Sequence, residues 1–136
     1  MIKILLVEDS KFLRLATERA LARAGYDMSS AIDGDEALRL AREKMPDLIL
    51  LDMLLPKMSG PDVLKALKAD PGTKAIPVVV MTGMSQKNAA RLQHDGAVGF
   101  LEKSTLELDK GPGKLLTALR EILGKLPAET ERATTA

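Results

Sequence analysis

Polar side chains that are able to do chemistry follow four separate apolar segments of this 136-residue chain. They are Glu8 and Asp9 after the first segment, Asp52 after the central one, Thr82 and Gly83 after the next, and Lys103 after the last. Three carboxylates brought together repel one another unless a cation offsets them, and oxygen ligands favour a hard divalent ion such as Mg²⁺. A lysine ammonium and a threonine hydroxyl nearby can hold the oxygens of a phosphoryl group. These residues therefore predict phosphoryl transfer to a carboxylate.

Asp52 is central because it ends the apolar run 48–51, which is typical of a short strand buried on both faces. In an open parallel sheet, ligands gather just beyond the carboxyl ends of the strands. Taken alone, Asp52 is better explained as a turn residue ahead of Pro56 and Gly60. The polar residues that follow the other segments favour the chemical interpretation.

The segments that must position these residues alternate between strand and helix patterns. Strands are predicted at 2–7, 28–32, 48–51, 76–81 and 98–101. Helices are predicted at 11–24 with Ser10 as its cap, after Gly34 and no further than Met45, from Pro61 to before Pro71, at 85–94 and at 113–126. Five strands alternating with five helices require right-handed crossovers and a parallel sheet covered on both faces. We therefore expect one doubly wound, three-layer α/β domain at 1–126 and a disordered tail at 127–136.

The composition describes an ordinary soluble globular protein and excludes several classes of function. Twenty basic residues against 19 acidic ones leave no surplus of positive charge for a nucleic acid. The chain has no cysteine, so it forms no disulfide and no thiolate metal site. The apolar stretch at the start is too short for a signal peptide or a membrane span. We expect a cytoplasmic protein with no direct nucleic-acid or membrane partner.

Two other kinds of phosphate chemistry on this type of sheet fit less well. Nucleotide and flavin binders cradle phosphate on a glycine- or hydroxyl-rich loop, whereas Glu8 and Asp9 place two anions there. A phosphatase of the haloacid-dehalogenase type also uses an aspartate nucleophile, but it has a second aspartate two residues later, where this chain has Leu54. We therefore rank a metal-dependent phosphatase last among three hypotheses for this chain; the other two follow below.

Four motifs, in order along the chain, carry a resemblance to a known family. They are Glu8-Asp9, Leu-Leu-Asp-Met-Leu-Leu-Pro-Lys-Met-Ser-Gly around Asp52, Ile-Pro-Val-Val-Val-Met-Thr-Gly ending at Gly83, and Gly-Phe-Leu-Glu-Lys ending at Lys103. At these spacings, residues 2–126 resemble the receiver domain of a two-component response regulator, and a stand-alone one similar to the chemotaxis regulators. The resemblance implies the flavodoxin-like fold of five parallel strands and five helices.

The resemblance also implies a role for each candidate residue. Asp52 would accept a phosphoryl group from a phosphohistidine on a sensor histidine kinase or a histidine phosphotransfer protein. The chain would be no enzyme beyond catalysing its own phosphorylation and dephosphorylation. The other implied roles are Mg²⁺ binding by Glu8, Asp9, Asp52 and the backbone carbonyl of Leu54, phosphoryl binding by Thr82, Gly83 and Lys103, and switching by Thr82 and Phe100.

In the family's switch, phosphate draws the Thr82 hydroxyl inward and the aromatic ring at the Phe100 position follows. The surface formed by helix 85–94, strand 98–101 and helix 113–126 then changes for a downstream protein. Onward phosphotransfer is the other output that the resemblance allows.

Two features depart from the family pattern. Ser104 follows Lys103 where the family usually has a proline with a cis bond. A non-proline cis bond costs about 3 kcal/mol, so either the bond is strained or the loop takes another path. The connection 104–113 is also longer than the family norm, and it either reshapes the output face or is a tolerated surface insertion. Ser104 is the one feature that favours the second hypothesis, a pseudo-receiver that serves as a constitutive protein-binding module.

Some residues also have plain structural explanations. An aromatic residue in an edge strand, such as Phe100, is often half-buried packing, and Thr82 is a common type of strand residue. His94 is better explained as a complement to a helix dipole than as a phosphotransfer group. Leu54 and Met84 match variable positions beside the phosphorylation site, where two apolar side chains hinder an attacking water. We therefore predict a long-lived phosphoaspartate.

Overall fold

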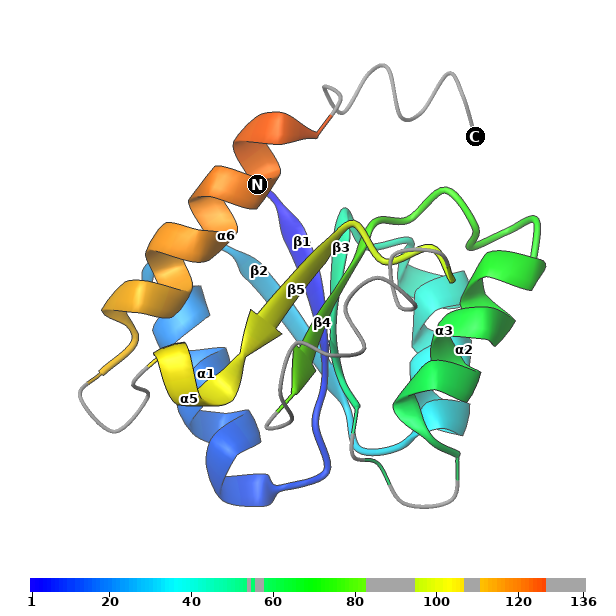
Figure 1. Ribbon diagram of the computed structural model, residues 1–136, viewed down its shortest axis with the longest axis horizontal. Coiled ribbons are helices and arrows are strands. Elements are labelled where there is room, and N and C mark those ends of the chain that lie inside the picture. Colours follow the sequence, from blue (N-terminus) through cyan, green and yellow to red (C-terminus); the bar gives the residue numbers. More distant parts are fainter. Residues whose placement is uncertain (54, 56–57, 83–94, 107–110, 127–136) are drawn as a thin grey trace.

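The computed structural model describes all residues except 54, 56–57, 83–94, 107–110 and 127–136 (Figure 1). Its elements are β1 (Lys3–Val7), α1 (Lys11–Arg23), β2 (Asp27–Ala31), α2 (Gly34–Lys44), β3 (Leu48–Asp52), α3 (Gly60–Ala69), β4 (Val78–Thr82), β5 (Gly99–Glu102), α5 (Lys103–Leu106) and α6 (Gly113–Lys125). Within these ranges no helix is long and apolar enough to cross a membrane. The predicted helix at 85–94 and the predicted tail at 127–136 lie outside the described residues.

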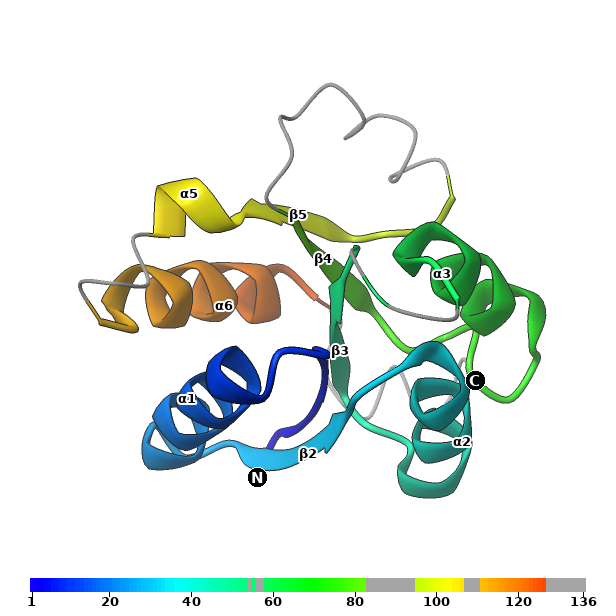
Figure 2. The ribbon, with the colours of Figure 1, turned by 90° about the horizontal axis from the view of Figure 1, so that it is seen from below.

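The strands form one sheet in the order β2-β1-β3-β4-β5, and every neighbouring pair is parallel. Helices α1 and α6 cover one face, and α2 and α3 cover the other (Figures 1 and 2). This arrangement confirms the predicted doubly wound fold. Because β3 lies between β1 and β4, the residues that follow these three strands meet at one edge of the sheet.

Side chains of the central strands alternate between two hydrophobic cores. Leu5, Ile49 and Leu51 belong to the core beneath α2 and α3, whereas Leu48 and Leu50 belong to the core beneath α1 and α6. All five residues of β3 are buried, as the uninterrupted apolar run predicts. Each fully buried leucine contributes about 2 kcal/mol of transfer free energy. Packing on both faces thus holds β3 and the carboxylate at its end in place.

The ends of the elements lie close to the predicted positions, and the differences have local causes. Ser10 caps α1 as expected, since its Oγ accepts a hydrogen bond from Leu13 N at 3.4 Å. Strand β4 begins at Val78 rather than at residue 76, because Pro77 has no N–H to donate to a neighbouring strand.

Helix α5 was not predicted, because three of its four residues fall within the connection 104–113, which was assigned to a loop. No cis peptide bond occurs among the described residues, and the Lys103–Ser104 step opens this helix. The chain therefore takes another path instead of a strained bond. Leu106 is only 4% exposed and packs in the same core as Leu115 and Leu119. The start of the 104–113 connection is thus part of the core and not a plain surface insertion.

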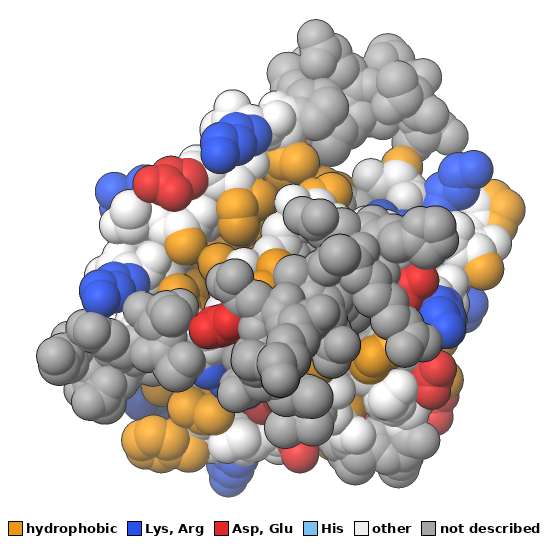
Figure 3. Space-filling model, in the orientation of Figure 1, with side chains coloured by type: hydrophobic (Ala, Val, Ile, Leu, Met, Phe, Trp, Pro, Cys, Tyr) orange, Lys and Arg blue, Asp and Glu red, His pale blue; other side chains and the backbone are white. Residues whose placement is uncertain are grey.

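Helix α6 packs closely against the edge strand β5. Figure 3 shows hydrophobic side chains gathered along the side of α6 that faces this strand. A Cβ atom on Gly99 would lie 3.1 Å from Ile122 Cδ1 and 3.3 Å from Val79 Cγ2. The absence of a side chain at Gly99 thus allows α6 to approach the sheet.

Candidate functional site

Three carboxylates meet at the carboxyl edge of the sheet. Glu8 and Asp9 follow β1, and Asp52 is the last residue of β3. Each offers an oxygen, and these oxygens lie within 4.8 Å of one another. Glu8 is 3% exposed and Asp52 is 2% exposed, whereas Asp9 is exposed. The acidic cluster, meaning Glu8, Asp9 and Asp52, is thus buried at its base and open on the side of Asp9.

Lys103 lies beside the two buried carboxylates. Its Nζ is 3.1 Å from Glu8 Oε1 and 3.3 Å from Asp52 Oδ1. Burial acts to lower the pKa of Lys103, but the negative charges of Asp52 and Glu8 outweigh burial, and the pKa is raised. Lys103 therefore remains a cation at this position. The path of the chain through α5 leaves its side chain able to reach Asp52.

Glu8 shows that one lysine does not neutralise the cluster. Burial raises the pKa of Glu8, and the hydrogen bond to Asp52 and the charge of Asp52 raise it further. The charge and hydrogen bond of Lys103 act in the opposite direction without cancelling the rise. The cluster brings three carboxylates together with one ammonium, and this surplus of negative charge favours the binding of a further cation.

The donor set of the acidic cluster fits a hard cation such as Mg²⁺. The three carboxylate oxygens lie within 4.8 Å of one another, near enough for one small cation to contact all of them after a modest adjustment. All three ligands are carboxylate oxygens, which suit Mg²⁺, whereas zinc sites usually include histidine nitrogen or cysteine sulfur. The predicted fourth ligand, the carbonyl of Leu54, lies outside the described residues.

The turn after β3 fixes the backbone beside Asp52. Met53 N donates to Met81 O at 3.0 Å, and Gly60 N donates to Met53 O at 3.1 Å. A Cβ atom on Gly60 would lie 2.5 Å from Met53 Cα and 2.8 Å from Asp52 O. Glycine thus allows α3 to begin directly against the backbone of the acidic cluster. The sequence showed Gly60 only as a turn residue, and its contact with Asp52 required the structure.

The loop from β1 to α1 holds the other two carboxylates. Glu8 N donates to Ala31 O at 3.0 Å, and Ser10 N donates to Glu8 Oε2 at 3.3 Å. Arg14 Nη1 donates to the carbonyl oxygens of Glu8 and Asp9. Sequence reasoning missed Arg14, although a basic residue near the start of a helix that follows two acids was a usable signal.

Thr82 lies on β4, which is next to β3, and Phe100 lies on the edge strand β5. The backbone of Thr82, the last residue of β4, pairs with Glu102, which immediately precedes Lys103. Phe100 is half-buried on β5 and packs against the core beneath α2 and α3. Gly83, Met84 and His94 lie outside the described residues.

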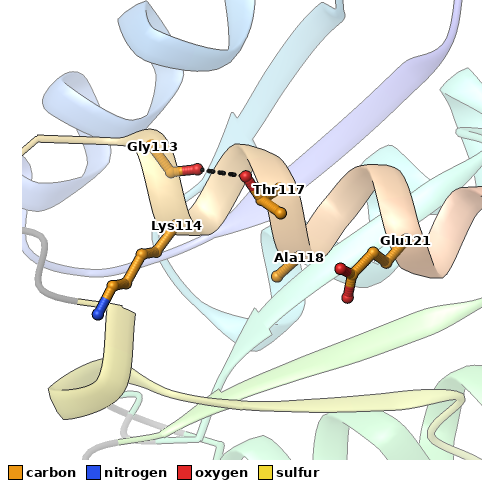
Figure 4. Close-up of a pocket in the computed structure, with 5 residues that line it drawn as sticks. All are labelled: Gly113, Lys114, Thr117, Ala118 and Glu121. Atoms are coloured by element: carbon orange, nitrogen blue, oxygen red, sulfur yellow. Dashed lines mark hydrogen bonds between the residues drawn. The ribbon is translucent and has the colours of Figure 1, made fainter.

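A hollow on α6 offers a different set of side chains (Figure 4). It has a volume of about 500 Å³ and is lined by Gly113, Lys114, Thr117, Ala118 and Glu121. Thr117 Oγ1 donates to the carbonyl of Gly113 at 3.0 Å, and four of the five lining residues are exposed. We therefore assign the chemistry to the acidic cluster, where Glu8 and Asp52 are buried and paired with Lys103.

Comparisons with known proteins point to one family. Residues 4–110 match the family model described as the response regulator receiver domain. The chain is 40% identical to the response regulator PleD of Caulobacter vibrioides over 103 residues, which cover 74% of this chain and 22% of PleD. It is 36% identical to the polar-differentiation response regulator DivK of Brucella anthropi over 101 residues, which cover 74% of this chain and 82% of DivK.

The solved structure of the chemotaxis response regulator CheY4 of Vibrio cholerae is similar as well. It matches with a TM-score of 0.80 and 32% sequence identity, over 90% of this chain and 98% of CheY4. The similarity therefore extends to the arrangement of the whole sheet and its helices.

Proposed function

The chain belongs to the response regulator receiver family, and from that premise we propose that it is a signalling domain controlled by phosphorylation of Asp52. One observation carries the proposal. The Asp52 carboxylate ends a fully buried strand and lies within 4.8 Å of the Glu8 and Asp9 carboxylates and 3.3 Å from Lys103 Nζ. A nucleophile, a ligand set for a cation and a positive charge for phosphoryl oxygens thus share one edge of the sheet.

The phosphoryl donor is a phosphohistidine on a sensor histidine kinase or a histidine phosphotransfer protein. An oxygen of Asp52 bonds to phosphorus as the P–N bond to the donor imidazole breaks, and the imidazole takes up a proton. Lys103 neutralises the transferred oxygens from its position beside Asp52. Thr82, the last residue of β4, and Gly83, which lies outside the described residues, are the other phosphoryl-binding residues of this proposal. The domain catalyses only its own phosphorylation and dephosphorylation.

Mg²⁺ is the cofactor of the proposed reaction, and the acidic cluster would hold it, with the backbone carbonyl of Leu54 as the predicted further ligand. When bound, it offsets the charge that the carboxylates and the phosphoryl group bring together. The charge balance supports this requirement, because Lys103 offsets only one of the three carboxylates.

The donor approaches over the N-terminal end of α1. An apolar groove of about 450 Å³ runs between α1 and the residues that lead into α6, including Gly111 and Pro112. Phe12, one of its lining residues, is 81% exposed. A helix of the donor that covers Phe12, three residues after Asp9 in the sequence, would bury this apolar surface.

Phosphorylation signals through the Thr82 and Phe100 switch to a surface that includes β5 and α6; residues 85–94, also predicted to take part, lie outside the described residues. The output is the binding of a downstream protein or onward phosphotransfer. The packing of Phe100 against the core beneath α2 and α3 supports a switch by repacking, because moving the ring must change that contact. The alternative of a constitutive binding module rests on Ser104, and Lys103 reaches Asp52 despite that residue.

The test is labelling by a small phosphodonor, acetyl phosphate, followed by intact mass. We expect one phosphoryl group per chain in the presence of Mg²⁺ and none in EDTA. Asp52→Asn should abolish labelling, while the matched control Asp62→Asn, at an exposed aspartate in the first turn of α3, and His94→Ala should retain it. Labelling that survives in Asp52→Asn would refute the assignment.

A further inference from the structure

Arg14 lies near the start of α1 and folds back toward the acidic cluster. Its Nη1 donates to the carbonyl oxygen of Glu8 at 3.2 Å and to that of Asp9 at 3.4 Å. The first backbone hydrogen bond of α1 runs from Arg14 N to Ser10 O, at 2.8 Å. The carbonyls of Glu8 and Asp9 therefore lie before the first backbone hydrogen bond of α1. Arg14 connects the helix to both of these residues.

Helix stability does not explain a cation at this position. The N-terminal end of a helix carries partial positive charge, so a basic side chain there is unfavourable. The first turn of α1 contains no acidic residue to compensate. The hydrogen bonds that Arg14 gives to the two preceding carbonyls supply a reason for its presence.

The loop between β1 and α1 is held at both ends, and Asp9 lies between them. Glu8 N is bonded to Ala31 O at the end of β2, and Ser10 caps the helix. Asp9 itself is exposed, and the bond from Arg14 ties its backbone to the helix. A shift of this loop would move the carboxylates of Glu8 and Asp9 relative to Asp52, which is fixed separately at the end of β3.

We propose that Arg14 is a positioning residue for the Mg²⁺ site, which sets the place of Glu8 and Asp9 by holding their backbone carbonyls. This inference rests on the proposed Mg²⁺-dependent function. Removing contacts that orient metal ligands commonly weakens metal affinity 10- to 100-fold. Because Arg14 acts through two long bonds to the backbone, the loss expected here is about tenfold, the lower end of that range.

The experiment is a calorimetric titration of the full chain with MgCl₂ alone. Arg14→Gln should weaken Mg²⁺ binding about tenfold. Arg14→Lys keeps the charge and has N–H donors, but places them differently, so its Mg²⁺ affinity should fall about threefold. Ser30→Ala is the matched control, because Ser30 Oγ donates to Glu18 Oε2 at 3.1 Å and so ties β2 to α1 away from the acidic cluster. It should lower the melting temperature and leave Mg²⁺ affinity within twofold of wild type.

A second measurement separates positioning from a general structural role. The labelling rate of Arg14→Gln with acetyl phosphate should fall at limiting Mg²⁺ and approach the wild-type rate at saturating Mg²⁺. Wild-type or tighter Mg²⁺ affinity in Arg14→Gln, or a loss of rate that saturating Mg²⁺ leaves in place, would overturn the inference. Should Arg14→Gln not fold, unchanged affinity in Arg14→Lys would overturn it instead. A wild-type chain that binds no Mg²⁺ would refute the proposed function itself.

Discussion

Replacing Lys103 with methionine removes a cation from beside two buried carboxylates while keeping an apolar side chain of similar length. The Glu8 and Asp52 side chains are each 3% exposed, and the Lys103 side chain is 23% exposed. Removing one member of a buried ion pair leaves the other charge uncompensated, which strongly destabilises the folded chain. The variant should therefore be less stable than wild type in the absence of metal.

The expected loss of stability depends on pH, because Glu8 remains neutral when it keeps its proton. The pKa of Glu8 in the folded chain is already raised above its ordinary value of 4.5. Its ionisation therefore costs stability as the pH rises through the raised pKa, and costs nothing well below 4.5. Removing Lys103 raises this pKa further, so the penalty grows with pH.

The linkage also sets an upper limit on the loss. A folded chain that keeps the Glu8 proton above the ordinary pKa of 4.5 loses about 1.4 kcal/mol of stability for each pH unit. This cost is at most about 5 kcal/mol at pH 8 and about 0.7 kcal/mol at pH 5. Wild type already bears part of this cost. We therefore expect Lys103→Met to lower the free energy of unfolding by about 2 kcal/mol at pH 8 and by less than about 0.7 kcal/mol at pH 5.

The assay is urea unfolding followed by circular dichroism in EDTA at both pH values. Lys65→Met is the matched control, since it removes the same charge from an exposed position on α3 and should change stability by less than about 0.5 kcal/mol. Adding Mg²⁺ at pH 8 should return most of the stability lost in Lys103→Met, because it supplies the missing positive charge. A loss that is equal at the two pH values, or equal to that of Lys65→Met, would show that the reasoning is wrong.

Two further predictions concern the surroundings of Asp52. Gly60→Ala should destabilise the chain by about 2 kcal/mol and slow its labelling by acetyl phosphate, because the added Cβ overlaps the backbone of the β3–α3 turn. Gly124→Ala, where a Cβ meets nothing within 4 Å, is the control and should be neutral or slightly stabilising in urea unfolding. Replacing Leu54 and Met84 together with asparagine should speed the loss of the phosphoryl group after the donor is removed, and an unchanged lifetime would contradict their proposed role.

The fold could be predicted because its signals are local. The apolar run at 48–51, the cap at Ser10 and the breaks at prolines and glycines each depend on neighbouring residues. The alternation of strands and helices then leaves a parallel sheet as the natural arrangement. Helix α5 was not predicted, because four residues are too few to show a helical period. The burial of Leu106 could not be predicted either, because it depends on α6, which follows later in the chain.

The environments of the acidic residues were harder to predict. Glu8 and Asp9 are neighbours in the sequence, yet one is buried and the other is exposed. Successive residues at the end of a strand point in different directions, so one side chain turns toward β3 and Lys103 while the next faces solvent. The fixed place of Asp52 against Gly60 and the bond from Arg14 to the loop carbonyls likewise depend on how α3 and α1 pack.

The sequence by itself determined the kinds of groups at the carboxyl ends of the strands and the family to which they point, because residue type and spacing are local properties. The tertiary structure alone decided which groups meet. Lys103 lies within 3.1 Å of Glu8, 95 residues away along the chain, because the order β1-β3-β4-β5 brings those strand ends to one edge. The raised pKa of Glu8 follows from the same packing, since burial and the nearby charge of Asp52 exist only in the folded chain.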